Sequence, residues 1–222
     1  MTKINLLYDK KVNCPICNDE FSTKKVRFSK LKLIERDSDF LTHYKDVNPL
    51  IYNIFICPNC GYAATEDRFE KISNEDRQII LDEISPKWKK RSYGNIRDID
   101  NGIESQKLAL YVGELLEYKK LELASICLNI GWLYRIKEDE EEYRFLENAR
   151  ELYEFAYYNE SLINTNMDQL NLAYLIGELN RRLGNKEDAL KWFNVVISDP
   201  DLKFNKGLEN LVRDQWRLTR EG

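Results

Sequence analysis

The sequence predicts an α+β protein that is mainly α, with a small four-cysteine β module followed by antiparallel helical hairpins. Three observations support this fold class. Two Cys-Pro-x-Cys motifs lie in the first 60 residues, apolar and polar residues alternate between them, and helical periodicity follows. We therefore expect a metal-binding β module over residues 1–70, a connecting helix and linker over 71–101, and a helical domain over 102–222.

The cysteine motifs have the spacing C-x2-C, 39 residues, C-x2-C. They supply Cys14, Cys17, Cys57 and Cys60. A two-residue gap lets one tight turn aim both sulfurs at the same ion, and each proline helps to fix that turn. Gly61 suits the left-handed backbone that brings amide N–H groups to the thiolates. The pattern predicts one tetrahedral four-thiolate metal site.

Zinc is the ion that we expect at these cysteines, as a structural ion. Iron in a rubredoxin-like site has the same ligand set and geometry, and we rank it second. Disulfides would require an oxidising compartment, and the start of the chain, Met1–Asp9, has too short an apolar run for a signal peptide. A redox Cys-x-x-Cys couple does not require a second motif, so the presence of two motifs argues against this interpretation. Cys127 lies in an apolar helical stretch, where we expect a small core residue.

The segment between the motifs predicts β structure. Val26 and Phe28 alternate with basic residues, and the apolar phase then slips by one near Ser29, which indicates a bulge or bend. A second apolar run, residues 50–56, leads into the second motif. Two strands and two cysteine turns make a zinc-ribbon-like module with a long insertion. A module this small has little core, so bound metal would supply much of its folding free energy.

The insertion contains Asp37, Asp39 and the single histidine, His43. These residue types suit hydrolytic chemistry beside a metal, which is one hypothesis. The alternative is that the two aspartates start a turn and that His43 lies on the surface. We favour the turn, because four thiolates usually close the coordination shell of the metal.

The charge distribution limits the partners that we expect. The net charge is −4, and neither the first 100 residues nor the remainder has a pronounced basic excess. No stretch approaches the ~20 apolar residues that cross a bilayer. Five basic residues of the β module leave nucleic-acid binding as a third hypothesis, although alternating positions are typical of the solvated face of a sheet. They are Lys24, Lys25, Arg27, Lys30 and Lys32. We expect a cytoplasmic protein without membrane contact.

Helical signals begin after residue 70. Ser73 and Asp76 resemble a capping box, and Ser85-Pro86 should end the helix that it opens. The stretch 88–101 is predicted as a linker.

The C-terminal region contains a weak internal repeat. Gly131 and Gly177 each follow an isoleucine within a helical pattern. Downstream of each glycine, three apolar residues share one helical face. They are Ala149, Tyr153 and Ala156 in the first unit and Ala189, Phe193 and Val196 in the second. This pattern resembles two tetratricopeptide-type hairpins; the alternative is an ordinary helical domain.

Stacked hairpins of that kind line a concave groove with their first helices. By this resemblance the groove would present aromatic and arginine side chains, which suit a peptide with carboxylates. The candidate groove residues are Trp132, Arg135, Tyr174, Glu178, Arg181 and Arg182.

The N-terminal motifs together resemble a bacterial family catalogued as domain of unknown function 2225. The elements that carry the resemblance are Cys14-Pro15-x-Cys17 with Phe21, Arg36-Asp37-x-Asp39-Phe40, Tyr44, Asn48-Pro49, Tyr52 and Cys57-Pro58-x-Cys60-Gly61-Tyr62-Ala63. The resemblance implies a bacterial metal-binding protein and supplies no activity.

Our hypothesis from the sequence is a non-enzymatic zinc-binding protein whose helical hairpins hold an unidentified protein or peptide. The alternatives are a metal-dependent hydrolase that uses Asp37, Asp39 and His43, and a zinc-ribbon nucleic-acid binder. The sequence contains no nucleotide-binding loop and no nucleophile elbow.

Overall fold

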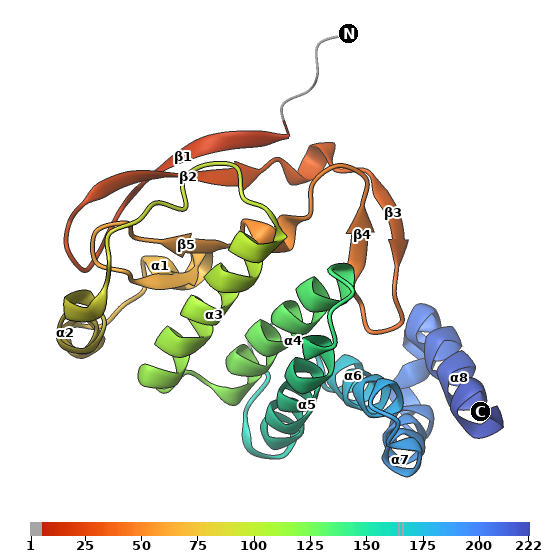
Figure 1. The fold of residues 1–222 in the computed structure, drawn as a ribbon. Coiled ribbons are helices and arrows are strands. Elements are labelled where there is room, and N and C mark those ends of the chain that lie inside the picture. Colours follow the sequence, from red (N-terminus) through yellow and green to blue (C-terminus); the bar gives the residue numbers. More distant parts are fainter. Residues whose placement is uncertain (1–5, 164, 166) are drawn as a thin grey trace, which may run out of the picture. The chain divides into compact units, whose positions relative to one another are not determined.

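A computed structural model describes residues 6–163, 165 and 167–222 (Figure 1). The strands are β1 (Leu7–Asn13), β2 (Glu20–Val26), β3 (Leu33–Arg36), β4 (Thr42–Tyr44), β5 (Ile54–Ile56) and β6 (Ala63–Thr65). The helices are α1 (Glu66–Phe69), α2 (Asn74–Glu83), α3 (Ile99–Leu115), α4 (Lys120–Ile136), α5 (Glu141–Asn159), α6 (Gln169–Arg182), α7 (Lys186–Ile197) and α8 (Lys206–Glu221). The predicted fold class, α+β and mainly α, is confirmed.

The chain forms two compact units that are not consecutive in the sequence. The first unit contains the residues up to Glu35, then Thr42–Tyr118 and Trp132–Asp139. The second contains Arg36–Leu41, Lys119–Gly131 and the chain from Glu140 onward. These boundaries differ from the three segments expected from the sequence, because α3 clusters with the β module and the tip of the β3–β4 hairpin clusters with the helices.

Three two-stranded antiparallel sheets form the β part of the first unit, paired β1–β2, β3–β4 and β5–β6. β1 and β2 pair from Leu7 opposite Val26 to Asn13 opposite Glu20. Of the bulge or bend predicted near Ser29, the structure has a bend, a 3₁₀ turn over Phe28–Lys30 that separates β2 from β3.

The apolar run before the second cysteine motif also differs from the expected strand. Its first part is a 3₁₀ turn, Pro49–Ile51, and the strand begins only at Ile54. The side-chain oxygen of Asn48 accepts a hydrogen bond from the Leu50 amide at 3.0 Å, and Pro49 has no amide hydrogen to give to a sheet. Local capping therefore outweighs the apolar pattern.

An aromatic cluster fills the core of the first unit. Phe69 is fully buried and its ring centre lies 4.9 Å from that of Tyr62, 5.8 Å from Phe55 and 5.9 Å from Phe21. Every residue of β5 is buried. This core orders the strands that lead into and out of the second cysteine motif.

The stretch expected as a linker packs against these strands. Arg97 is only 5% exposed, and its guanidinium donates hydrogen bonds to the carbonyls of Ile54 (2.9 Å) and Ile51 (3.2 Å) and to the Thr23 hydroxyl (3.2 Å). Burial lowers the pKa of Arg97 to about 10. A buried arginine with several carbonyl partners joins β2, β5 and the intervening turn.

Helical hairpins with close crossings make up the second unit. A Cβ atom added to Gly131 of α4 would lie 2.9 Å from Leu146 of α5, and one added to Gly177 of α6 would lie 2.8 Å from Phe193 of α7. The six apolar residues of the predicted repeat are all buried: Ala149, Tyr153, Ala156, Ala189, Phe193 and Val196. Small residues therefore allow the helices to approach closely, and Gly184 (φ 82°) makes the turn between α6 and α7.

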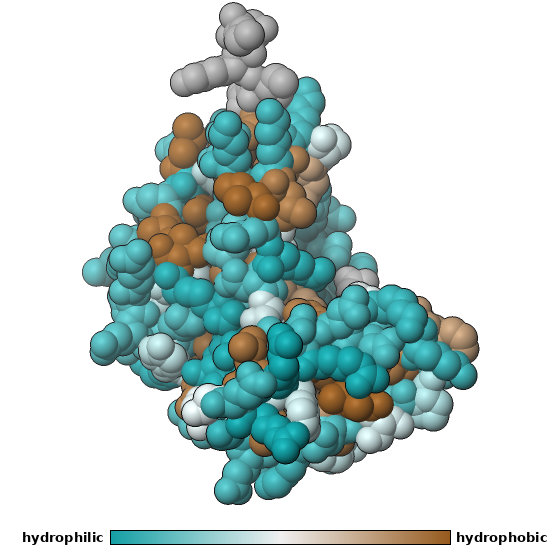
Figure 2. Space-filling model, turned by 90° about the vertical axis from the view of Figure 1, so that its right-hand side faces the viewer, coloured by the Kyte–Doolittle hydropathy of each residue, from teal (hydrophilic) through white to brown (hydrophobic). Residues whose placement is uncertain are grey.

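The surface is largely hydrophilic on the face drawn in Figure 2, with separate apolar patches. Large exposed apolar side chains include Phe28, Leu33 and Ile34 of the first unit, each about three-fifths exposed. No helix in the described part of the chain combines the length and the apolar character needed to span a membrane.

Candidate metal centre

Each cysteine motif forms the turn of a β-hairpin. The β1–β2 turn carries the first pair and the β5–β6 turn the second. In the first turn the Asn18 amide donates to the Cys14 carbonyl at 2.9 Å, and in the second the Gly61 amide donates to the Cys57 carbonyl at 3.0 Å. Asn18 (φ 59°) and Gly61 (φ 80°) occupy the same position after their motif and share the left-handed conformation. The two turns thus share the same backbone hydrogen bond and the same left-handed residue.

The four sulfur atoms lie close together without bonding to one another. The Sγ atoms of Cys14 and Cys60 are 3.6 Å apart, as are those of Cys17 and Cys57, and all four lie within 4.8 Å. A disulfide would require about 2.05 Å. Zinc–sulfur bonds of about 2.3 Å in a tetrahedron place the sulfurs about 3.8 Å apart. The arrangement therefore fits a tetrahedral metal ion.

Backbone amides point at two of these sulfurs. The N–H groups of Ile16 and Cys17 donate to the sulfur of Cys14, and those of Asn59 and Cys60 donate to the sulfur of Cys57. Such donors stabilise a thiolate and orient it toward a metal.

Crowding of the thiols affects their ionisation. The hydrogen bond from Cys14 holds the pKa of the Cys57 thiol well below its usual range, whereas the hydrogen bonds from its neighbours raise the pKa of Cys60. Four adjacent thiols resist full ionisation because each new thiolate is repelled by the first. A bound divalent cation would favour ionisation of all four thiols, since it attracts every thiolate at once.

The four cysteines would close the coordination shell of a bound ion. Cys14, Cys57 and Cys60 are at most 3% exposed, and Cys17 is half-buried. Four thiolates fill a tetrahedral shell and leave no position for water or substrate. Cys127 is buried in α4, outside this cluster.

The predicted cluster of Asp37, Asp39 and His43 is not a second metal-binding group. Within residues 6–163, 165 and 167–222, the only set of three or more His, Cys, Asp or Glu side chains close enough for one ion is the four cysteines. Asp39 is fully buried, and its carboxylate lies 3.4 Å from Nε of Arg182. The Asp37 amide donates to the Leu41 carbonyl at 2.8 Å, as the predicted turn requires.

The tip of the β3–β4 hairpin packs on α6, at residues that the sequence assigned to a peptide groove. The hydroxyl of Ser38 donates to Glu178 at 2.6 Å, and the hydroxyl of Tyr174 donates to the Ser38 carbonyl at 2.8 Å. The Phe40 ring lies 5.4 Å from that of Tyr174. Tyr174 and Glu178 are therefore buried under residues 36–41 of the same chain.

The other groove candidates divide between the units. Arg181 donates to Glu178 from Nε at 2.7 Å, and Arg182 does so at 3.0 Å, both within the second unit. Trp132 and Arg135 belong to the first unit. Peptide binding at these residues stays a prediction.

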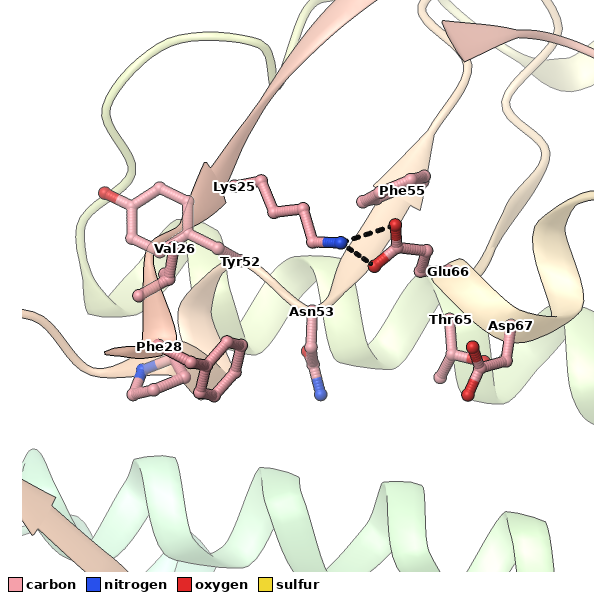
Figure 3. Close-up of a pocket in the computed structure, with 10 residues that line it drawn as sticks. Lys25, Val26, Phe28, Tyr52, Asn53, Phe55, Thr65, Glu66 and Asp67 are labelled. Carbon is pink, nitrogen blue, oxygen red and sulfur yellow. Dashed lines mark hydrogen bonds and ion pairs between the residues drawn. The ribbon is translucent and has the colours of Figure 1, made fainter. Parts of the chain in front are cut away.

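A cavity of about 250 Å³ lies elsewhere in the first unit (Figure 3). It is lined in part by Phe28, Tyr52 and Phe55. Figure 3 shows Lys25 reaching the Glu66 carboxylate, at 2.6 Å, and Lys10 contacts the same carboxylate at 2.6 Å. Burial works to raise the pKa of Glu66, but these two hydrogen bonds outweigh it and lower that pKa. The Glu66 carboxylate is thus paired with two lysines within the protein.

Sequence reasoning missed two residues that contact the cysteine turns. Arg77 of α2 donates to the Ile16 carbonyl, and Trp88 donates from its indole nitrogen to the Pro58 carbonyl at 2.9 Å. Both contacts span at least 30 residues of sequence. No local pattern indicates such contacts, although a tryptophan within a predicted linker is a signal that it packs somewhere.

The fold and the cysteine cluster define an α+β protein with a four-thiolate site that could hold a metal ion. The chain belongs to the family described as "Uncharacterized protein conserved in bacteria (DUF2225)", whose family model matches residues 7–219. The resemblance predicted from the motifs is therefore confirmed.

A curated relative comes from Borreliella burgdorferi (strain ATCC 35210 / DSM 4680 / CIP 102532 / B31) and is described as an uncharacterized protein. It is 26% identical over 164 residues, which cover 64% of this chain and 57% of the relative. The matched part thus spans little more than half the length of that relative. No solved structure matches the chain.

Proposed function

We propose that the protein is a non-enzymatic zinc-binding protein in which Cys14, Cys17, Cys57 and Cys60 hold one structural Zn²⁺. The observation that supports this proposal most strongly is the group of four sulfurs within 4.8 Å. Four thiolates leave no open position for the water that a catalytic zinc activates. The ion would join the β1–β2 hairpin to the β5–β6 hairpin, which are distant in sequence.

The metal content of the purified full-length chain tests this proposal. We expect one zinc per chain, and we expect Cys57→Ser to lose it. Cys127→Ser is the matched control, because this buried cysteine lies outside the cluster, and it should keep one zinc. Iron in place of zinc would change the proposed ion, whereas full zinc content in Cys57→Ser would contradict the proposed site.

We further propose that the helical hairpins are a tetratricopeptide-like scaffold for a protein or peptide partner. Two features support this role. The glycine crossings at Gly131 and Gly177 follow the repeat pattern, and α6 already accommodates an acidic and aromatic segment, residues 36–41. A partner with similar chemistry would compete with that segment.

A labelled peptide with the sequence of residues 34–43 tests the scaffold proposal. We expect it to bind a full-length Asp37→Ala, Asp39→Ala variant more tightly than the unchanged chain, because the internal segment then competes less. Adding Arg182→Ala to that variant should abolish binding. Equal binding to all three proteins, or to none, would contradict a peptide-binding role for this part of α6.

A further inference from the structure

The two cysteine turns are each held by one side chain from outside the hairpins. Arg77 donates to the Ile16 carbonyl from Nε at 2.9 Å and from Nη2 at 2.7 Å. Trp88 donates from Nε1 to the Pro58 carbonyl at 2.9 Å. Arg77 lies on α2, and Trp88 follows the 3₁₀ turn after that helix. One short stretch of chain therefore contacts both turns.

The two carbonyls belong to particular peptide units. The Ile16 carbonyl and the Cys17 amide share one planar peptide group, and that amide donates to the sulfur of Cys14. The Pro58 carbonyl and the Asn59 amide share another, and that amide donates to the sulfur of Cys57. Since a peptide group is rigid, a donor that fixes its oxygen also fixes the direction of its N–H.

The two contacts also polarise these peptide groups. A guanidinium makes a charge-assisted hydrogen bond, and successive hydrogen bonds strengthen one another. Ile16 is fully buried and Arg77 is half-buried, so the Arg77 contact is partly shielded from water. At the second turn the Trp88 ring covers Gly61 so closely that an added Cβ would lie 2.6 Å from it.

We propose that Arg77 and Trp88 are positioning residues of the metal centre. They act through the 16–17 and 58–59 peptide groups to aim amide N–H donors at Cys14 and Cys57, and so slow the release of the ion. The inference rests on the proposed zinc site and assigns residues that control it. Outer partners of metal ligands commonly change metal affinity by about 10–100-fold.

The test compares zinc-loaded full-length chains with Arg77→Met and Trp88→Phe. Phenylalanine keeps an aromatic ring at this position and removes the N–H donor together with one ring of the indole, so the metal spectrum is needed to separate lost donation from lost packing. Gln78→Ala on α2 and Lys89→Ala beside Trp88 are matched controls, because no contact of either with a cysteine turn is observed. Zinc release into excess chromogenic chelator is followed well below the unfolding temperature.

We expect each positioning variant to hold one zinc and to release it about tenfold faster, as the outer-partner effect implies. The controls should release zinc like the unchanged chain, and Arg77→Lys should restore part of the slow release. In cobalt-loaded protein, the thiolate-to-metal absorption band should shift in Trp88→Phe, a change that lost packing stability alone would not cause.

Two outcomes overturn the inference. If Trp88→Phe and Arg77→Met release zinc at the rate of the unchanged chain, the two residues do not position the site, while the zinc proposal stands. If the unchanged chain binds no metal, both proposals fail. Trp88→Phe decides the question on its own should Arg77→Met fail to fold.

Discussion

The two compact units differ in what orders their interiors. The first unit has strands of three to seven residues that pair only in twos, and its buried set includes three of the four clustered cysteines. The second unit has helices of 12 to 19 residues from α5 to α8, which cross at glycines and pack aromatic side chains. Two-stranded sheets are marginal on their own, whereas paired helices bury a continuous face. The first unit should therefore depend on an ion and the second on side-chain volume.

Removing the metal should have the largest effect, and only on the first unit. Structural zinc contributes an apparent binding free energy of roughly 10–16 kcal/mol in small domains. We expect a strong chelator, or Cys60→Ser, to abolish amide protection in β1, β2, β5 and β6 and to leave that of α6 and α7 in place. Hydrogen exchange with mass spectrometry measures this difference. Equal loss of protection in both units would show that the comparison is wrong.

Truncating a core residue of the second unit should destabilise that unit and leave the metal site of the first unit intact. Phe193 is fully buried, with its ring centre 5.8 Å from that of Tyr174, and it covers Gly177. Phe193→Ala should lower the free energy of unfolding by about 3–5 kcal/mol, because it removes apolar contacts and leaves a cavity. Urea denaturation measures the loss. Zinc content should remain at one per chain, and a fall in zinc content would contradict independent cores.

A pair of glycine substitutions sharpens the comparison at the level of single turns. Gly61 (φ 80°) and Gly184 (φ 82°) share the left-handed conformation, but only Gly61 has a ring against it. Gly61→Ala should cost about 2–4 kcal/mol, from backbone strain and overpacking against Trp88. Gly184→Ala is the matched control, with nothing within 4 Å, and should cost about 1–2 kcal/mol. Equal costs in thermal unfolding would mean that Trp88 moves away freely.

The smallest effect that we predict concerns one hydrogen bond of the second unit. The Tyr153 hydroxyl donates to the Ser125 hydroxyl at 3.0 Å, and the Tyr153 ring is buried. Tyr153→Phe keeps the ring and removes the donor, so it should lower the free energy of unfolding by about 1 kcal/mol. Chelator-treated and zinc-loaded chains should show the same loss in α5 exchange, since no metal contact is involved.

The sequence predicted those features that depend on neighbouring residues. The C-x2-C spacing, the left-handed residue after the second motif and the serine cap of α2 are local, and the structure has all three. The glycine crossings could also be predicted, because Gly131 and Gly177 each precede an apolar set with the same internal spacing of four and then three residues. Periodicity thus predicted most of the fold class, and the motif spacing predicted all four clustered cysteines.

The features that the sequence did not predict depend on distant contacts. Arg77 and Ile16 are 61 residues apart, and Arg97 and Ile54 are 43 apart. An arginine on a short helix looks like a solvated charge until its carbonyl partner is known. The packing of residues 36–41 on α6 is a similar case, because Asp39 and Arg182 are separated by most of the chain.

The nested division of the chain has a consequence for how the protein can be made. Segments of the first unit flank residues 36–41 and 119–131 of the second, so the two units interleave along the sequence. During translation, the first unit has all its segments only after residue 139 has been made. By then residues 36–41 of the second unit have already been synthesised. A stop codon anywhere before residue 132 removes segments of both units at once. No single cut separates the two units, because any chain that reaches residue 139 to complete the first unit also carries residues 36–41 and 119–131 of the second.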